Sequence, residues 1–162
     1  MTSCKRYKKD DDYETPKSAW NAIKPYLPSG KVAYDPFICS GRSVEFFEEL
    51  NILHNEPEGD FFENEINGDY VLSNPPFTLK KEVLQRLVCE LDIPFIMIMP
   101  SQTINAVYFR DIFKGKEDLL QIAIPRKRIN FIKDGVEKKG CAFDCFYFCY
   151  KMNLPSSIIF LN

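Results

Sequence analysis

The sequence lacks any apolar run near the length of a membrane-spanning helix. Hydrophobic residues make up 45% of the 162 residues, but they occur in runs much shorter than the roughly 20 residues that a span requires. Residues 1–16 also lack the apolar core of a secretory signal peptide. We therefore expect an intracellular protein that is neither secreted nor bound to a membrane.

Glycine and histidine are scarce as well. The chain has seven glycines and a single histidine, His54. No stretch combines lysine with several glycines after a predicted strand, as a phosphate-binding loop would require. His54 lies within a predicted strand, and we interpret it as a strand residue without a part in the chemistry. Internal repeats and low-complexity segments are absent too, so we predict one domain over residues 13–162, preceded by a flexible segment over residues 1–12.

The sequence carries no overall excess of positive charge. Its formal net charge is −2, which does not by itself indicate binding to nucleic acid. The charge is unevenly distributed, however, because residues 125–139 contain six lysines and arginines against two acids. From composition alone, this segment either contacts phosphates or forms an ordinary solvated loop. The candidates for nucleic-acid contacts are Arg126, Lys127, Arg128 and Lys133.

Six cysteines are present, yet a disulfide framework is not expected in an intracellular chain of this length. Cys141, Cys145 and Cys149 are spaced four residues apart. Residues at even separation share one face of a strand, so these three thiols would line one side of it. Buried structural thiols explain this pattern better than a metal site, and we expect no metal.

Strand and helix patterns alternate along much of the chain. Apolar residues at helical spacing predict helices, and short apolar runs bounded by turn residues predict strands. The predicted helices are residues 15–27, with Thr15 as N-cap and Pro16 at the first helical position, 42–50, 79–91 and 105–113. The predicted strands are residues 31–37, 51–56, 68–77, 93–100, 119–132, 141–152 and 156–161. This alternation argues for an α/β protein with a mainly parallel sheet.

Polar and small residues gather where the first predicted strand ends, in the stretch DPFICSGRS. Ligands of parallel sheets bind outside the carboxyl ends of the strands. Asp35 offers a carboxylate that suits an ammonium group, and Gly41 allows the backbone to approach a ligand closely. About 20 residues further along, Glu56 occupies the place where a ribose hydroxyl is commonly bound.

The connection after Glu56 adds features that suit a purine. Asp60 is a candidate hydrogen-bond acceptor, and Phe61 and Phe62 are candidate walls for the ring. Together with Asp35 these residues describe a pocket for an adenosine that carries a cationic amino-acid tail. That ligand is S-adenosylmethionine.

The stretch SNPPF, residues 73–77, ends the next predicted strand with two consecutive prolines. In order, YETP, DPFICSG, an acid after a strand, DFF and NPPF resemble the amino-methyltransferases, above all the DNA N6-adenine methyltransferases. The resemblance spans residues 13–100, and the later INFI and FDCFYFCYKM look like that family's closing strands. It implies a Rossmann-like class I methyltransferase fold: a mostly parallel, doubly wound sheet with an antiparallel C-terminal strand.

By this resemblance, NPPF holds the target amine. The Asn74 side-chain oxygen and the Pro75 carbonyl would accept hydrogen bonds from the adenine amine, which frees its lone pair to face the methyl group. Pro75 and Pro76 would make the acceptors rigid, because their φ is restricted. Phe77 would stack on an extruded base. The predicted catalytic residues are therefore Asn74, Pro75, Pro76 and Phe77.

The resemblance also extends the cofactor site. Tyr13, Thr15 and Pro16 match the N-terminal segment that folds over the methionine end of the cofactor. The chain departs from the family pattern at Cys39, where a glycine is usual, and this side chain would narrow the pocket. The predicted cofactor-binding residues are Tyr13, Thr15, Pro16, Asp35, Pro36, Phe37, Cys39, Gly41, Glu56, Asp60, Phe61 and Asn74.

These inferences predict an enzyme that methylates the N6 amine of adenine in DNA with S-adenosylmethionine. Two alternatives remain open: methylation of an RNA adenine or of a protein glutamine amide, and a non-catalytic methyltransferase-like subunit that binds nucleic acid. A separate target-recognition domain has little room, so residues 101–107 and 133–140 are the candidates for gripping the nucleic acid. Specificity would then be short or relaxed, or a partner protein, such as a second copy of this chain, would supply it.

Overall fold

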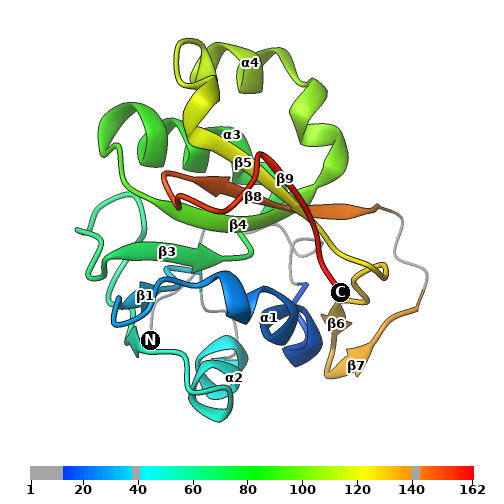
Figure 1. Ribbon diagram of the computed structural model, residues 1–162. Helices are drawn as coiled ribbons and strands as arrows, with labels where there is room; N and C mark the ends of the chain where they lie inside the picture. Colours follow the sequence, from blue (N-terminus) through cyan, green and yellow to red (C-terminus); the bar gives the residue numbers. More distant parts are fainter. Residues whose placement is uncertain (1–12, 38–40, 140–142) are drawn as a thin grey trace.

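The computed structural model describes residues 13–37, 41–139 and 143–162. Its main feature is a seven-stranded sheet in the order β2-β1-β3-β4-β8-β5-β9 (Figure 1). The strands of this sheet are β1 (Ala33–Tyr34), β2 (His54–Asn55), β3 (Tyr70–Ser73), β4 (Phe95–Pro100), β5 (Leu120–Ile124), β8 (Cys145–Tyr150) and β9 (Ile158–Phe160). A separate hairpin is formed by β6 (Ile132–Lys133) and β7 (Val136–Glu137).

Within the described residues, four α-helices and five 3₁₀ or π segments connect the strands. The α-helices are α1 (Lys17–Ile23), α2 (Arg42–Glu49), α3 (Lys80–Leu84) and α4 (Val107–Phe113). The 3₁₀ segments are η2 (Lys24–Tyr26), η3 (Phe77–Leu79), η5 (Ser101–Asn105) and η6 (Glu117–Leu119), and η4 (Gln85–Glu90) is a π-helical segment. α3 and η4 together form the amphipathic helix predicted over residues 79–91. Within the described ranges, no helix combines the length and the apolarity that crossing a bilayer requires.

The strand directions confirm the predicted fold class. All neighbouring strands of the large sheet run parallel except at β8, which is antiparallel to both β4 and β5. The sheet is therefore mostly parallel and Rossmann-like, with one antiparallel strand late in the chain. That antiparallel strand is the penultimate one, because β9 follows it and pairs in parallel with β5.

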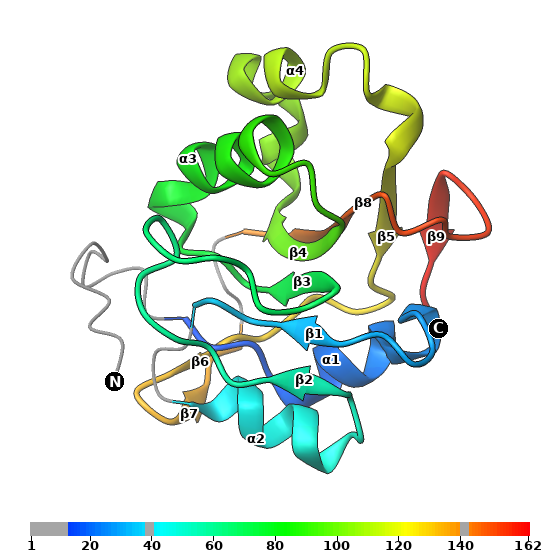
Figure 2. The same ribbon diagram turned by 90° about the vertical axis from the view of Figure 1, so that its left-hand side faces the viewer.

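Helices cover both faces of the sheet, as expected for a doubly wound fold (Figures 1 and 2). Along β4, Ile96 and Ile98 belong to the core on the side of α1 and α2, whereas Phe95, Met97 and Met99 belong to the core on the side of α3 and α4. Successive side chains of a strand point to opposite faces, and both faces here are buried. This explains why residues 93–100 are almost entirely apolar.

The long strand predicted over residues 119–132 is wrong in its second half. β5 ends at Ile124, directly before Pro125, whose nitrogen has no hydrogen for a sheet bond. The chain pairs again only at β6, which turns into β7 through Asp134 and Gly135 at φ of 52° and 76°. Two consecutive positive φ values are the conformation that a tight hairpin turn needs. Residues 133–137, predicted as part of a loop, thus belong to a hairpin.

The predicted start of the first helix is also wrong by one residue. Pro16 is the N-cap of α1, and no side chain caps the helix. Thr15 instead continues an extended segment in which Glu14 pairs with Ile132 through two backbone hydrogen bonds of 2.8 Å. Pairing to the β6 strand therefore keeps residues 13–15 out of the helix.

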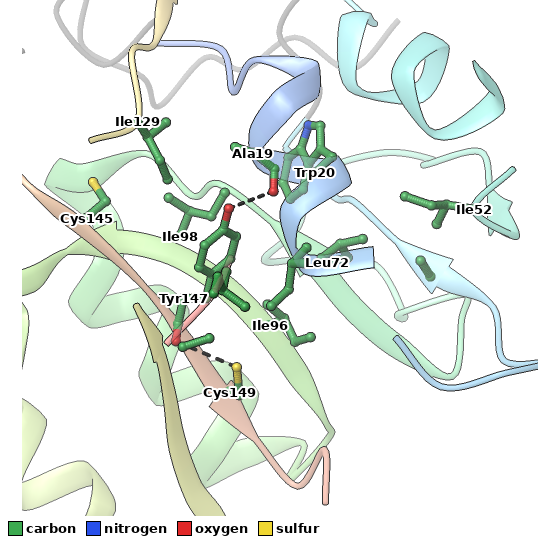
Figure 3. Packing of buried hydrophobic residues seen from close by; sticks show 14 of the residues in the cluster. Ala19, Trp20, Ile52, Leu72, Ile96, Ile98, Ile129, Cys145, Tyr147 and Cys149 are labelled. Atoms are coloured by element: carbon green, nitrogen blue, oxygen red, sulfur yellow. Dashed lines mark hydrogen bonds between the residues drawn. The ribbon is translucent and has the colours of Figure 1, made fainter. Parts of the chain in front are cut away.

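The cysteines of β8 are buried, as predicted. Cys145 and Cys149 are free thiols that lie in the core on the side of α1 (Figure 3). Burial raises the pKa of the Cys149 thiol to about 12, so this group is an inert neutral thiol at physiological pH. Cys141 lies outside the described residues, and Cys89 is exposed on η4.

Candidate active site

The two motif regions predicted from the sequence meet at adjacent strand ends. Asp35 follows β1, Ser73 is the last residue of β3, and these two strands are neighbours in the sheet. The Ser73 hydroxyl donates a hydrogen bond of 2.6 Å to Asp35 Oδ1, and the Phe37 backbone N–H donates one of 3.0 Å to the same oxygen. Asp35 is therefore held next to the start of the NPPF stretch.

The Asp35 carboxyl is almost fully buried, at 4% exposure. Burial raises the pKa of Asp35, and hydrogen bonds from Ser73, from the Phe37 backbone and from the Ser43 side chain only partly oppose this shift. A buried carboxylate of this kind gains from a cation placed beside it, because the cation favours the ionised form. The geometry suits an ammonium group better than an anion.

The loop after Asp35 leads into α2 through Gly41. This residue is the N-cap of α2 and adopts a left-handed conformation with φ of 83°. A Cβ added at Gly41 would meet no atom of the described residues within 4 Å, so these residues leave space beside its backbone. Pro36 and Phe37 are buried at the start of the loop. Cys39, the position where the chain departs from the family pattern, lies outside the described residues.

The Asn74 side chain is fixed by one of its two polar atoms. Its Nδ2 donates a hydrogen bond of 2.9 Å to the Tyr13 carbonyl. This bond orients the carboxamide, and Oδ1 is left buried without a hydrogen-bond partner in the described part of the chain. A buried acceptor without a partner is unfavourable for the folded state by about 1–3 kcal/mol. This oxygen is therefore available to accept a hydrogen bond from a ligand.

The two prolines after Asn74 are buried and present their carbonyls differently. The Pro76 carbonyl accepts a hydrogen bond of 2.9 Å from the Leu79 N–H. Among the described residues, no donor is found for the carbonyl of Pro75. The Pro75 carbonyl and Asn74 Oδ1 thus supply two acceptors in consecutive residues.

The N-terminal segment holds a second buried acceptor without a partner. Thr15 is 5% exposed, and its Oγ1 has no hydrogen-bond partner within the described ranges. The segment is tied down on two sides, because Glu14 pairs with β6 through its backbone and with Arg42 Nε through its carboxylate at 2.6 Å. Hydrogen bonds and an ion pair therefore connect residues 13–16, which include the predicted cofactor residues Tyr13, Thr15 and Pro16, to Asn74 and to the first turn of α2.

Four aromatic rings lie beside Asn74. The Phe77 ring makes edge contacts with Phe143 at 5.1 Å and with Phe131 at 6.1 Å between centroids. The Tyr13 ring contacts the same two rings, at 5.8 Å and 6.3 Å. Phe131 is fully buried, whereas Tyr13, Phe77 and Phe143 are partly exposed. The three partly exposed rings can offer faces to a flat ligand.

Phe131 and Phe143 were not among the residues predicted for the site. Both lie in stretches that resemble the family's closing strands, INFI and FDCFYFCYKM, but that resemblance gave neither ring a role in the site. The pairing of Glu14 with Ile132 brings residues 131–133 to the N-terminal segment, and Phe143 lies two residues before β8. The sequence contains no local signal for that pairing.

Phe61 and Phe62, the aromatic residues predicted to enclose a purine, differ in their exposure to solvent. Phe61 is 6% exposed and packs on Phe37 at 4.8 Å between ring centroids, with the Arg86 guanidinium 5.6 Å from its ring. Phe62 is partly exposed. Asp60 Oδ1 accepts a hydrogen bond of 2.8 Å from the Phe62 N–H. Phe61 is thus a core residue, and the roles of Asp60 and Phe62 in cofactor binding stay predictions.

Glu56 is exposed at the end of β2, and its predicted contact with a ribose stays a prediction. Its carboxylate lies near Glu48 and His54, with the three ligand atoms within 4.8 Å of one another. The His54 Nδ1 lies 2.8 Å from the Ile52 carbonyl oxygen. The three groups lie close enough together to share a cation, a feature that the sequence did not suggest.

The four basic residues predicted to contact nucleic acid lie in two parts of the structure. Arg126 and Lys127 are exposed after β5, and Arg128 beside them forms an ion pair with Asp144 at 2.6 Å. Lys133 lies on the hairpin, with its Nζ 4.8 Å from the centroid of the Tyr13 ring. Of these four residues, Lys133 is the one that contacts the residues around Asn74 within the described part of the chain.

No family model matches the sequence, and no curated protein matches it. Among solved structures, the chain is similar to one described as "Crystal structure of Methyltransferase from Pyrococcus furiosus". The two chains are 13% identical, with a TM-score of 0.42, over 83% of this chain and 81% of the other. A likeness of this size carries no argument about the reaction, which must be inferred from the site itself.

Proposed function

We propose that this protein transfers a methyl group from S-adenosylmethionine to the exocyclic N6 amine of adenine in DNA. The observation that carries the proposal is the Asn74 carboxamide. Its Nδ2 is bonded to Tyr13, and its buried Oδ1 has no partner among the described residues, so it is oriented to accept a hydrogen from a ligand. The choice of adenine in DNA comes from the resemblance of the NPPF stretch.

The residues around Asp35 fit this cofactor. The ammonium of its amino-acid tail would balance the buried Asp35 carboxylate, and Thr15 Oγ1 would gain a partner within the methionine end. The space that the described residues leave beside Gly41 gives room for the ligand to approach the backbone. When bound, S-adenosylmethionine supplies an electrophilic methyl group on a sulfonium.

At the amine, the protein's part is to orient and polarise. Asn74 Oδ1 and the Pro75 carbonyl accept the two amine hydrogens, which draws the nitrogen away from planarity and frees its lone pair. With S-adenosylmethionine bound, the methyl group would pass to this nitrogen and leave a neutral thioether, and the methylated cation would then lose a proton to water. Acceptors fixed in advance stabilise the developing positive charge without reorganising during the reaction.

Access to the amine requires a base that is not stacked in a duplex. Extrusion of a base costs a few kcal/mol. Stacking on an aromatic ring is favourable by about 1–3 kcal/mol and offsets part of that cost. Phe77, Tyr13 and Phe143 provide such rings beside Asn74. This aromatic surface favours a nucleobase over the glutamine amide of a protein, because a primary amide has no ring to stack.

The test is methyl transfer from labelled cofactor to separate pools of duplex DNA, single-stranded DNA, RNA and protein. We expect label in N6-methyladenine of DNA, and we expect Asn74→Ala to lower the rate by at least about 100-fold, as for loss of a preorganised acceptor. Label in RNA or in protein alone would overturn the DNA assignment. Cofactor binding without transfer to any pool would identify the non-catalytic subunit instead.

The control for Asn74→Ala is Gln121→Ala. Gln121 also has a carboxamide that donates to backbone carbonyls, those of Leu154 at 2.9 Å and Ser156 at 2.8 Å, but it lies on β5 away from Asn74. Gln121→Ala should retain full activity. Thermal unfolding of both variants shows whether a loss of activity reflects a loss of folded protein.

A further inference from the structure

A groove separate from the Asn74 site lies between α1 and the segment that follows β5. Its volume is about 670 Å³, which is within the range of ligand-binding cavities. Its lining includes Ser18, Ala19, Arg126, Lys127, Ile129 and Asn130. The basic residues Arg126 and Lys127, candidates for nucleic-acid contacts by their composition, thus border a cavity.

The wall of the groove is positively charged. Arg126 and Lys127 are exposed on it, and within the described part of the chain neither forms an ion pair. Among the described side chains that line the groove, Glu137 of β7 is the acidic one, and the side chains of Arg126 and Lys127 carry more charge than it does. Arg128 adds little, because Asp144 lies 2.6 Å from its Nε. A groove with this charge suits phosphate groups.

The floor of the groove is apolar and rigid. Tyr147 reaches from β8 to α1, where its hydroxyl donates a hydrogen bond of 2.6 Å to the Ala19 carbonyl (Figure 3). Ile129 is 6% exposed and lies near the same end of α1 (Figure 3). Ala19 and Tyr147 are buried as well, so these side chains close the groove from below.

The groove and the Asn74 site are joined by one short piece of chain. Ile129 lines the groove, Phe131 contacts the Phe77 ring at 6.1 Å, and Lys133 lies over Tyr13. Residues 129–133 thus run from the groove to the rings of Tyr13 and Phe77.

We propose that this groove binds a nucleotide adjacent to the target adenine, with its phosphate at Arg126 and Lys127 and its base on the floor. This proposal rests on the proposed function, and it specifies a second nucleotide, next to the target adenine, that the enzyme contacts. The Asn130 carboxamide and the Ser18 hydroxyl border the groove, and groups of this kind can hydrogen-bond the edge of a base. The groove is thus where a short sequence preference would be read.

The first test is binding of a single-stranded 12-nucleotide DNA, measured by fluorescence anisotropy at several salt concentrations. We expect Arg126→Glu with Lys127→Glu to weaken binding by at least about tenfold at low salt and to make the log–log salt slope shallower by roughly 1.5. The matched control is Lys81→Glu with Lys114→Glu, two exposed lysines near α3 and α4. An equal loss in both double variants, or none in either, would overturn the assignment.

The second test separates base reading from phosphate contact. Asn130→Ala should leave the salt slope unchanged, whereas the ratio of kcat/KM between the best and the worst neighbouring base should fall toward one. An unchanged ratio would overturn the reading role of Asn130.

The failure of this inference is distinguishable from failure of the proposed function. Methylation of DNA that is unaffected by Arg126→Glu with Lys127→Glu would overturn the groove assignment and keep the proposed function. Oligonucleotide binding that depends on these residues, without methyl transfer by the unmodified protein, would overturn the proposed function and keep a nucleotide in the groove.

Discussion

The Asn74 site and the groove between α1 and the segment after β5 differ in the solvent exposure of their polar groups. At the Asn74 site, Thr15 Oγ1 and Asn74 Oδ1 are buried without partners in the described ranges, and the Asp35 carboxyl has a raised pKa because it is buried. In the groove, Arg126 and Lys127 are exposed to solvent. The first arrangement lowers the stability of the unliganded protein, and the second hardly affects it.

This difference indicates two kinds of recognition. Buried acceptors are strong and directional, so they select one small group in one orientation and are little affected by salt. Exposed cations act over a longer range and tolerate many sequences, but salt screens them. Variants of the Asn74 site should therefore change the chemistry, and variants of the groove should change the salt dependence of binding.

The largest effect outside Asn74 is expected for Asp35→Asn. Loss of one partner of a buried charge pair costs about 2–5 kcal/mol of binding free energy, or roughly 30-fold to several-thousand-fold in cofactor affinity. The free energy of unfolding at pH 7 should not fall. The neutral amide that replaces the carboxylate avoids the free-energy cost of burying a charge. Calorimetric titration with cofactor and chemical denaturation measure the two quantities.

The pH dependence sharpens the same prediction. The pKa of Asp35 is raised in the folded protein, so the unliganded fold loses stability as the pH rises from the unfolded-state pKa through the folded-state value. Cofactor affinity should change in the opposite sense and fall as Asp35 becomes protonated at low pH. In Asp35→Asn this contribution should be absent from both profiles. An Asp92→Asn variant, which alters the exposed ion pair with Lys151, is the control.

A smaller effect is expected for Phe143→Ala, at the junction between the two regions. Removing a stacking ring should weaken binding of the nucleic acid by about 1–3 kcal/mol, or roughly 5-fold to 150-fold in KM. Cofactor affinity should change less than KM, because Phe143 is not itself a predicted cofactor-binding residue and contacts that site through the ring of Tyr13. Phe160→Ala, an exposed ring on the edge strand β9, is the matched control. Equal KM values for the two variants would argue against a stacking role for Phe143.

The smallest effect is expected for Asp144→Asn in the groove region. Arg128 lowers the pKa of Asp144, so the acid is ionised and neutralises this arginine at physiological pH. The substitution should release the Arg128 charge and strengthen oligonucleotide binding by less than about fivefold, as for an exposed ion pair. Anisotropy titrations at low salt would detect this change, with kcat unaltered. Weaker binding would contradict a role of positive charge in the groove.

Much of the fold was predictable because its signals are local. The apolar run at residues 93–100 indicated a strand covered on both faces, and β4 is buried on both. The periodicity of residues 79–91 indicated the helix that α3 and η4 form. The ends of elements were less predictable: the strand expected to continue past Pro125 stops at Ile124, and the helix expected to start with Thr15 as its cap begins only after Pro16.

The candidate site was predictable only in part, for the same reason. Asp35 and Asn74 each follow a recognisable strand, and the parallel pairing of β1 with β3 brings them together. The place of Phe131 in the site has no such signal, because the pairing of its neighbour Ile132 with Glu14, 118 residues earlier in the chain, brings it there.

By itself, the sequence determined the α/β class, the alternation of elements and the polar residues at the strand ends, because these follow from periodicity and from turn chemistry within a few residues. Only the tertiary structure decided that Asn74 is oriented by Tyr13, that Thr15 Oγ1 has no partner among the described residues, and that Arg126 and Lys127 border a groove against α1. These features join segments far apart in the chain, and their energies depend on burial, which no local pattern specifies.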